Sequence, residues 1–342
     1  MTGNIDWQAL PTLVTGGASF IGSHLVEALV ARGARVRVAD DLSSGRRENI
    51  AALLDSGAVE FVEGDLRNRA VAHHAAQGMS AVFHLAANHG GRGYIDTHQV
   101  ACSTNLALDS SVFSACRDAG VEHIVYASSG CVYPTELQSD ASELLYLSED
   151  RVGPPYDADR LYGWAKLMGE LTLREYARET GMKTASLRYF TTYGPRCQEN
   201  HAIIAMIARA FIGQNPFVVW GNGEQVRNWT HVSDIVEGTI LAAELVDDGT
   251  AINLGTMERT RVIDCARQVL EYTGHRATIE LHPEMPTGPV NRVADNGLAR
   301  QVLQWTPNVS FVEGLHSTID WYFSSKNRDR VSAELSAKLL DR

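Results

Sequence analysis

The chain has 342 residues, of which 44% are hydrophobic and 21% charged, and its formal net charge at pH 7 is −11. A chain of this length and composition can bury one large α/β core or two smaller ones. The acidic balance argues against nucleic acid and anionic membranes as partners, because both would repel such a surface.

The first ten residues, MTGNIDWQAL, lack the basic and then apolar pattern of a secretion signal. No apolar run approaches the roughly 18 residues that a membrane-spanning helix needs. The five cysteines are scattered and include no C-x-x-C pair, so the sequence predicts neither a disulfide framework nor a metal site. We therefore expect a cytoplasmic protein without a bound metal.

Short apolar runs alternate with helix-length segments through the first half of the chain, an order that predicts βαβ units and a doubly wound parallel sheet. The first expected helix follows the first strand directly. Its Ile21, Leu25, Ala28 and Leu29 share one face, and Gly33 ends it. The expected strands are TLVTG (12–16), RVRVAD (35–40), VEFVEGD (59–65), AVFHLAA (81–87), HIVYASS (123–129) and TASLRYF (184–190).

After residue 190 the pattern loosens into shorter helices between Gly- and Pro-rich stretches such as YGPR, GNGE and PEMPTGP. We expect residues 1–190 to form the parallel-sheet domain and residues 191–326 to form a smaller α/β lobe that binds the substrate. Part of this second segment can cross back to the first domain. Residues 327–342 are predicted to form a charged helix or a frayed tail.

The stretch VTGGASFIGSHL (14–25) is typical of a dinucleotide-binding turn between a strand and a helix. Gly16, Gly17 and Gly22 let the backbone turn tightly and approach a pyrophosphate at the helix N-terminus. Ser19 stands where a further glycine is usual. It is small, and its hydroxyl is able to donate to a phosphate, so the motif is expected to function.

Two aspartates follow the next strands. Asp40 comes 18 residues after Gly22, close to the spacing at which an acidic side chain meets the adenosine ribose, and it favours NAD over NADP, whose 2′-phosphate it would repel. The alternative is a solvated loop carboxylate. Asp65 is a candidate for holding the adenine edge or, equally, a surface-turn aspartate.

Tyr162 and Lys166 form a Y-x-x-x-K pair inside LYGWAKLMGE, where the i, i+4 spacing places both on one face of a helix. An ammonium near the phenol lowers its pKa and makes it a usable base. Ser129 lies at the carboxyl end of a predicted strand, where ligands of doubly wound sheets bind. Taken singly, each residue also fits a helix surface or an ordinary turn.

The motifs TGGASFIGSHL, HLAA, ASSGCVYP, YGWAK and RNWTHVSD, in this order, resemble the extended short-chain dehydrogenase/reductase family of nucleotide-sugar epimerases and dehydratases. The resemblance covers nearly the whole chain. It implies a Rossmann domain, bound NAD, a Ser129/Tyr162/Lys166 triad and a nucleotide-sugar substrate that is transiently oxidised at C4. It also implies a homodimer formed through the helices near 98–119 and 158–180.

The resemblance assigns further contacts. Those implied for NAD are Gly16, Gly17, Ser19, Phe20, Ile21, Gly22, Asp40, Asp65, Leu66, Leu85, Ala86, Ala87, Tyr162 and Lys166. Those implied for the substrate are Gly90, Gly91, Arg92, Ser129, Thr191, Asn200, Arg227 and Arg292. The two last arginines suit a pyrophosphate because a planar guanidinium meets its oxygens bidentately.

Within the family, AANHGGRGYI and SSGCVYP are most similar to the branch of the GDP-mannose 3,5-epimerases. That likeness places Cys131 at an acid/base position and His201 at a second one, where the branch has a lysine. Thr191 stands where the family usually has a substrate-binding asparagine. The alternatives are that Cys131 is a small apolar filler and that His201 caps a helix or binds a phosphate.

Inversion at C3 and C5 requires two proton handlers, because one group removes a proton and another returns it on the opposite face. Epimerisation at C4 alone needs only the triad and is the close alternative. A dehydratase is disfavoured, since Gly130 and Cys131 replace the Asp-Glu pair that such members carry. Decarboxylation of a glucuronate, with Arg92 or Arg160 holding the carboxylate, is a third choice, and an NAD-binding sensor or scaffold is the non-enzymatic one.

Overall fold

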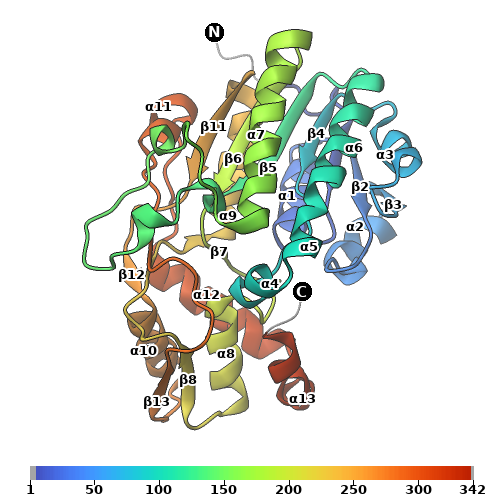
Figure 1. Ribbon diagram of the computed structural model, residues 1–342. Helices are drawn as coiled ribbons and strands as arrows, with labels where there is room; N and C mark the ends of the chain where they lie inside the picture. Colours follow the sequence, from blue (N-terminus) through green and yellow to red (C-terminus); the bar gives the residue numbers. More distant parts are fainter. Residues whose placement is uncertain (1–4, 340–342) are drawn as a thin grey trace.

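Seven parallel strands form the central sheet of the computed structural model, which describes residues 5–339 (Figure 1). The strand order is β11-β6-β5-β4-β1-β2-β3. The six strands expected from the sequence are confirmed, and their bounds are β1 (Thr12–Thr15), β2 (Val36–Asp40), β3 (Val59–Glu63), β4 (Ala81–His84), β5 (His123–Ser129) and β6 (Lys183–Tyr189).

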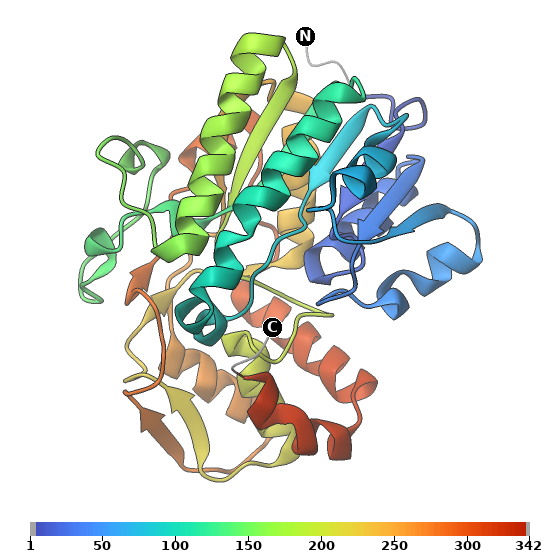
Figure 2. The ribbon, with the colours of Figure 1, turned by 45° about the vertical axis from the view of Figure 1, so that its right-hand side comes forward.

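Helices cover both faces of this sheet, which explains why its central strands are buried and read as continuous apolar runs (Figure 2). On one face, α1 (Phe20–Ala31), α9 (Val232–Leu245) and α11 (Gly297–Leu303) pack against β1, β2 and β6. On the other face lie α3 (Arg69–Ala76), α6 (Asn105–Asp118) and α7 (Arg160–Thr180). The short α2 (Ala51–Asp55) leads into β3. The expected doubly wound Rossmann sheet is thereby confirmed.

The seventh strand is supplied by the second half of the chain. β11 (Asp248–Leu254) pairs with β6, and α9 before it packs on the same sheet. The chain therefore crosses back to the sheet after the expected boundary at residue 190. The sequence analysis did not identify this strand.

The remaining residues build a smaller lobe below the carboxyl ends of the strands (Figure 1). Its helices are α8 (Ala202–Ile212), α10 (Val262–Thr273), α12 (Phe311–Ser325) and α13 (Arg328–Lys338), and its strands are β8 (Phe217–Trp220), β9 (Val226–Arg227), β12 (Thr260–Arg261), β13 (Ile279–His282) and β14 (Asn291–Arg292); β7 (Thr192–Tyr193) pairs with β10 (Thr230–His231). The core of the lobe is formed by helices around the two-stranded parallel sheet β8-β13, and its other short strands form a three-stranded sheet, β12-β9-β14, and the pair β7-β10.

The segment expected as a charged helix or frayed tail is helical over residues 328–338 and docks on the lobe. Val331 and Leu335 of α13 are buried in the core of the lobe, against α8. Residues 340–342 of that segment lie outside the described part of the chain. No helix among the described residues combines the length and apolarity that crossing a bilayer would require.

The strand order places a crevice between β1 and β4, because the chain winds outward in opposite directions from this point of the sheet. The loops after β1, β4 and β5 open at this crevice toward the smaller lobe. Two short helices follow β4, namely α4 (Arg92–Thr97) and α5 (Gln99–Ser103), and a 3-10 turn, η2 (Gly130–Val132), follows β5. Ligands of such sheets bind at this edge, and the candidate site lies here.

Candidate active site

The turn after β1 has the geometry that a pyrophosphate-binding loop requires. Gly16 has a φ of +68°, which an L side chain rarely adopts, and a Cβ on Gly22 would overlap the Gly16 carbonyl oxygen. A Cβ on Gly17 would lie 2.8 Å from Val38 Cγ1. All three glycines are therefore required for the turn to pack against the sheet and to leave its backbone accessible.

Ser19 does not disturb this turn. Its φ of −89° is ordinary for any residue, so the position needs no glycine. Its hydroxyl donates a hydrogen bond to the Gly16 carbonyl oxygen at 2.5 Å, which ties the two ends of the turn together. Ser19 is also the N-cap residue of α1. The N-terminus of this helix lines a cavity between the sheet and the smaller lobe, which we call the central cavity.

Asp40 lies at the end of β2, on the cavity next to the glycine turn. Its carboxylate accepts hydrogen bonds from the backbone N–H groups of Ala18 and Leu42 at 3.0 and 2.9 Å. Asp65 lies on the same cavity and pairs with Arg67 at 2.7 Å. The other predicted cofactor contacts on this cavity are Gly16, Ser19, Leu66, Leu85, Ala86 and Ala87, whereas Phe20, Ile21 and Gly22 line the adjoining central cavity.

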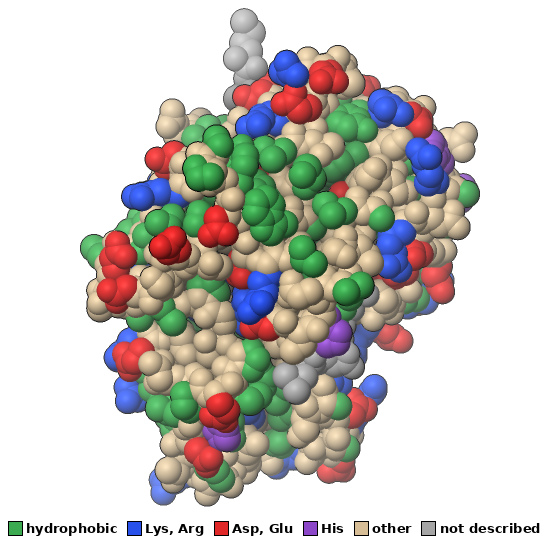
Figure 3. All heavy atoms as spheres, in the orientation of Figure 1, with side chains coloured by type: hydrophobic (Ala, Val, Ile, Leu, Met, Phe, Trp, Pro, Cys, Tyr) green, Lys and Arg blue, Asp and Glu red, His purple; other side chains and the backbone are tan. Residues whose placement is uncertain are grey.

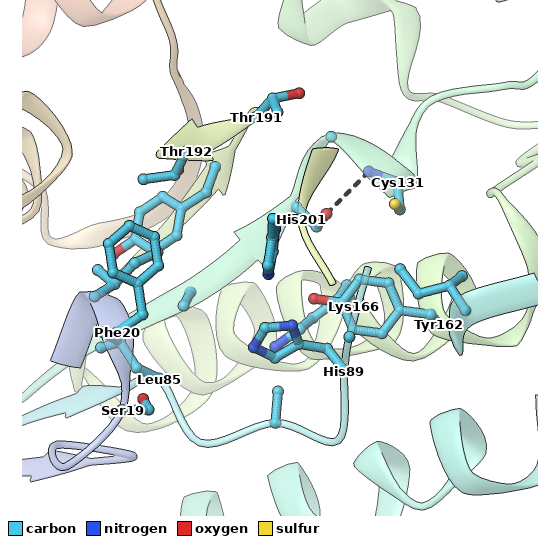
Figure 4. Close-up of a pocket in the computed structure, with 18 of the residues that line it drawn as sticks. Ser19, Phe20, Leu85, His89, Cys131, Tyr162, Lys166, Thr191, Thr192 and His201 are labelled. Carbon is cyan, nitrogen blue, oxygen red and sulfur yellow. Dashed lines mark hydrogen bonds between the residues drawn. The ribbon is translucent and has the colours of Figure 1, made fainter. Parts of the chain in front are cut away.

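Ser129, Tyr162 and Lys166 meet in the central cavity (Figure 4). The start of α7 is held against η2 because the Asp159 N–H donates to the Cys131 carbonyl at 2.8 Å. A Cβ on Gly163 would overlap the same carbonyl oxygen. The glycine in YGWAK therefore allows the first turn of α7 to carry the tyrosine up to the end of β5.

Burial dominates the electrostatics of this pair. It raises the pKa of Tyr162 well above the usual range, whereas the hydrogen bond with Ser129 acts to lower it. The direction is opposite to the one that the sequence argument expected from Lys166. Burial also lowers the pKa of Lys166, while Asp109 and Glu170 raise it. Further positive charge close to the phenol is required to make Tyr162 a base near neutral pH.

Cys131 lies in η2 on the central cavity, and its sulfur accepts a hydrogen bond from Arg292 Nη1 at 3.2 Å. Arg292, in β14, also donates to Asp159 Oδ2 at 3.0 Å. The backbone N–H of Cys131 donates to Ser129 Oγ at 3.1 Å, which is the dashed line in Figure 4. These contacts fix the thiol between the triad and the smaller lobe.

His201 reaches the same cavity from the second lobe (Figure 4). It precedes α8 as the N-cap residue, but its side chain makes no capping hydrogen bond, so the capping alternative does not describe the imidazole. Burial lowers the pKa of His201 to about 4, and the ring is neutral at pH 7. A Cβ on Gly91 would overlap the Asn200 carbonyl oxygen, so this glycine allows the two lobes to meet beside His201.

The sequence analysis missed His89. Its ring centroid lies 6.4 Å from that of Tyr162 and 6.4 Å from that of His201, and it lines both the central cavity and the cavity of Asp40. In Figure 4 the imidazole lies beside Tyr162 and Lys166. The available signal was its place in AANHGGRGYI, a segment in which the sequence analysis assigned Ala86 and Ala87 to NAD and Gly90, Gly91 and Arg92 to the substrate.

A second cavity adjoins the central one on the side of the smaller lobe. We call it the arginine cavity because Arg92, Arg209, Arg227 and Arg292 line it. Burial, together with Arg292 and Arg92, lowers the pKa of Arg227 to about 9. Four guanidinium groups around one cavity suit an anionic ligand such as a diphosphate. Residues shared with the central cavity include Gly90, Cys131, Thr191, Asn200 and His201, whereas Trp220 and Trp229 line the arginine cavity alone.

Carboxylates already engage the two arginines considered as partners of a sugar carboxylate. Arg92 is paired with Asp96 at 2.6 Å and with Asp159 at 2.6 Å. Arg160 is paired with Asp96 at 2.9 Å, and it does not appear among the residues that line the central and arginine cavities. Arg92 therefore lines the arginine cavity with its charge largely compensated.

The C-terminal helices are linked to the segment that carries His201. Glu199 is buried, accepts a hydrogen bond from the Tyr322 hydroxyl at 2.9 Å, and lies 3.6 and 3.7 Å from the amines of Lys326 and Lys338. Leu339, next to the last of these, lines the arginine cavity.

A model of the NAD dependent epimerase/dehydratase family matches residues 12–255. The chain belongs to this family. It is 30% identical over 321 residues to the GDP-mannose 3,5-epimerase of Arabidopsis thaliana, with 92% of this chain and 82% of that protein covered. It is 29% identical over 312 residues to UDP-glucuronic acid decarboxylase 1 of the same plant, with 91% and 69% covered.

A solved structure of the family has the same fold. The UDP-glucuronic acid 4-epimerase of Bacillus cereus, in complex with UDP-glucuronic acid and NAD, matches with a TM-score of 0.81 at 28% identity, with 91% of this chain and 98% of that chain covered. NAD is the cofactor of the family, as expected from Asp40. The glycine turn fits it, since the absence of Cβ atoms on Gly16, Gly17 and Gly22 lets the turn pack tightly, and Gly16 and Gly22 line the cavities there.

Proposed function

We propose that the protein is a nucleotide-sugar epimerase that inverts C3 and C5 after transient oxidation at C4. The placement of Cys131 and His201 carries this proposal. Both line the central cavity with Tyr162, yet Cys131 follows β5 of the large sheet and His201 precedes α8 of the smaller lobe. Inversion beside a ketone needs proton handlers on two faces of the sugar, and groups from different lobes can supply them.

The triad begins the reaction. Tyr162 takes the proton of the C4 hydroxyl, and Ser129 hydrogen-bonds the same oxygen and holds it in place. Bound NAD supplies the hydride-accepting and hydride-returning chemistry and the positive charge that the buried phenol needs. Lys166, one helical turn from Tyr162, adds a second positive charge below the phenol.

The second stage uses the thiol and the imidazole. A ketone at C4 acidifies the hydrogens on C3 and C5, because the resulting carbanion is delocalised as an enolate. His201 accepts a proton as the neutral imidazole that its lowered pKa provides. Cys131, which accepts a hydrogen bond from Arg292, returns a proton to the carbon from the opposite face. Arg227 and Arg292 bind the pyrophosphate, and Thr191 and Asn200 contact the sugar.

Epimerisation at C4 alone is the alternative, since it requires only Ser129, Tyr162 and Lys166, and the solved relative with NAD is named for this reaction. Decarboxylation receives less support, because Asp96 and Asp159 already engage Arg92 and Asp96 engages Arg160. Dehydration is disfavoured by Gly130 and Cys131 after the catalytic serine.

The deciding experiment is incubation with a panel of GDP-, UDP- and dTDP-sugars in deuterated water, followed by mass spectrometry and proton NMR. Deuterium at C3 or C5 supports the proposal. Inversion at C4 without deuterium uptake identifies a 4-epimerase and removes the roles of Cys131 and His201. Release of carbon dioxide identifies a decarboxylase.

A Tyr162→Phe variant separates an enzyme from an NAD-binding sensor or scaffold. We expect it to keep its NAD and to lose turnover by about 10²-fold or more, because the base is missing. Tyr272→Phe, which removes a hydroxyl on the exposed side of α10, is the matched control. Equal turnover by the Tyr162 variant and the wild type would reject the enzymatic assignment.

We further propose a cytoplasmic homodimer formed through α6 and α7. Leu161, Trp164 and Met168 lie on one face of α7 and are exposed, as is Leu106 on α6. Figure 3 shows hydrophobic side chains over this part of the molecule, while acidic and basic side chains are interspersed over the rest of the face. Light scattering of the wild type and of Trp164→Asp tests this: the variant should be monomeric.

A further inference from the structure

Buried polar side chains form a chain next to Lys166, and they are not among the residues that line the central cavity. Thr15 Oγ1 lies 2.7 Å from His84 Nδ1, and His84 Nε2 lies 3.0 Å from Asp109 Oδ1. The Tyr126 hydroxyl donates to Asp109 Oδ2 at 2.6 Å. Lys166 Nζ lies over the face of the Tyr126 ring, 4.6 Å from its centroid. The mechanism proposed above uses none of these residues except Lys166.

The hydrogen-bond pattern assigns the protons in this chain. Thr15 Oγ1 accepts from the backbone N–H groups of Leu85 and Ala86, each at 3.1 Å. Both of its lone pairs are used, so its own hydrogen goes to His84 Nδ1. His84 therefore carries its hydrogen on Nε2 and donates it to Asp109, and the imidazole is neutral.

Asp109 consequently holds a negative charge that its hydrogen-bond partners do not neutralise. It accepts from a neutral imidazole and from a phenol, and it is only 4% exposed. A buried carboxylate of this kind is costly unless a cation is near. Lys166, itself 1% exposed, is the cation on the other side of the Tyr126 ring.

The groups facing Lys166 are Tyr126 of β5, Asp109 of α6, Tyr162 and Glu170 of its own helix, and His89 of the loop after β4. Glu170 is already paired with the Arg188 guanidinium at 2.9 Å. Because Arg188 compensates the charge of Glu170, Asp109 is the carboxylate whose uncompensated negative charge acts on Lys166.

The sequence of α7 is adapted to this arrangement. A Cβ on Gly169 would lie 2.5 Å from the Tyr126 hydroxyl oxygen and 2.6 Å from two ring carbons. Gly169 thus allows the Tyr126 ring to lie flat against α7, with its hydroxyl at Asp109 and its face under Lys166.

We propose that Asp109 is a positioning residue whose carboxylate keeps the buried amine of Lys166 protonated, and that His84 and Thr15 tie this carboxylate to the loop after β4. Its consequence for turnover rests on the proposed function, because a protonated Lys166 is needed to stabilise the Tyr162 phenolate. The charge of Lys166 can be measured independently of any reaction.

The composition of the chain makes that measurement direct, since its four lysines are Lys166, Lys183, Lys326 and Lys338. Protein labelled with ¹³C at lysine Cε gives four NMR signals, which single Lys→Arg variants assign. We expect Lys166 to lose its proton at a lower pH in Asp109→Asn than in the wild type. Asp118→Asn, which removes an exposed carboxylate of the same helix, should leave the Lys166 titration unchanged.

Two more variants keep the test decisive. Asp109→Ser removes the charge without placing an amide donor opposite His84, and it replaces Asp109→Asn if that variant does not fold. Tyr126→Phe removes one hydrogen bond but keeps the carboxylate and the ring, so its Lys166 titration should stay close to that of the wild type. Identical Lys166 titrations in the wild type and the Asp109 variants would overturn the proposal.

The pH profile of kcat gives the second readout. In Asp109→Asn the alkaline limb, set by Lys166, should move to lower pH, with a loss of about tenfold at pH 9. A uniform loss at every pH would indicate a merely structural role and overturn the proposal. If the wild type turns over no nucleotide sugar, the proposed function fails, whereas the lysine titration still decides the role of Asp109.

Discussion

The Arg292 guanidinium donates a hydrogen bond to the Cys131 sulfur at 3.2 Å, across 161 positions of sequence. Arg292 belongs to the short strand β14 of the smaller lobe, and Cys131 belongs to the 3-10 turn that follows β5. The contact therefore spans the junction where the central cavity and the arginine cavity meet. A ligand whose anionic part engages Arg292 would bring its reacting carbons next to the thiol.

Replacing Cys131 by alanine tests the thiol as a proton handler. We expect deuterium incorporation at C3 or C5 to fall by about 10²-fold or more, while oxidation at C4, followed as absorbance of reduced NAD, persists. Cys102→Ala is the matched control, because this buried thiol belongs to the same apolar cluster. Wild-type deuterium uptake by Cys131→Ala would show that the thiol only fills space.

Two substitutions in the glycine turn should have opposite outcomes. Gly22→Ala should lose bound NAD, since the added methyl group overlaps the Gly16 carbonyl oxygen. Ser19→Gly should retain NAD, because the backbone at position 19 already has an ordinary φ. The NAD released on denaturation, quantified by chromatography against protein concentration, gives the measurement. Loss of NAD from Ser19→Gly would assign the serine hydroxyl a direct part in binding.

Arg227→Met should weaken binding of the nucleotide sugar without lowering the stability of the protein. The Arg227 guanidinium donates to the carbonyls of Val226 and Thr287 at 2.8 Å each and lies near two other arginines. We expect KM for the nucleotide sugar to rise about tenfold or more through loss of a charge-assisted hydrogen bond, without a fall in melting temperature, because the cation that is removed is partly buried and lies near two other cations.

Arg300→Met, on the exposed side of α11, serves as the control for this substitution and should change neither quantity. An unchanged KM in Arg227→Met would place the pyrophosphate elsewhere.

The stability of the protein should depend on pH through His201. Its pKa is about 4 in the folded protein and about 6.5 in the unfolded chain, so the unfolded state binds the proton first as the pH falls. The free energy of unfolding should therefore decrease from pH 6.5 to pH 4, by about 2 kcal/mol from this partly exposed group. In His201→Gln the decrease should be smaller by that amount, as urea denaturation at several pH values would measure. Equal slopes in the two proteins would contradict a lowered pKa of the His201 imidazole in the folded protein.

Local patterns predicted the strand–turn–helix units well because the determinants are local. Six strands, the first helix and its end at Gly33 follow from apolar runs and a glycine. The sequence analysis did not identify β11. Its residues, DGTAINL, begin with polar and small side chains, and they follow a helix in the second half of the chain, where the alternation of strands and helices is less regular. Nothing in that stretch indicates that the chain returns to the edge of β6.

The candidate site was predictable where a motif links residue type to spacing, as for Tyr162 and Lys166. Site residues that belong to no spacing motif could not be predicted. His89 stands alone in a loop, and Asp109 stands in a helix segment, ALDSS, that reads as a solvent-exposed turn of helix. Only the packing of α6 against α7 and β5 reveals that this carboxylate is buried. The pairing of Arg92 with Asp159, 67 positions away, is equally non-local.

The ion pairs of Glu199 connect the C-terminal helices to the segment that carries His201 in the candidate site. Two amines from the last two helices secure a carboxylate that stands two positions before His201. Trimming residues from Lys338 onward would leave that carboxylate with one cation fewer and would remove Leu339 from the wall of the arginine cavity. Affinity tags and fusion partners are therefore best attached at the opposite terminus.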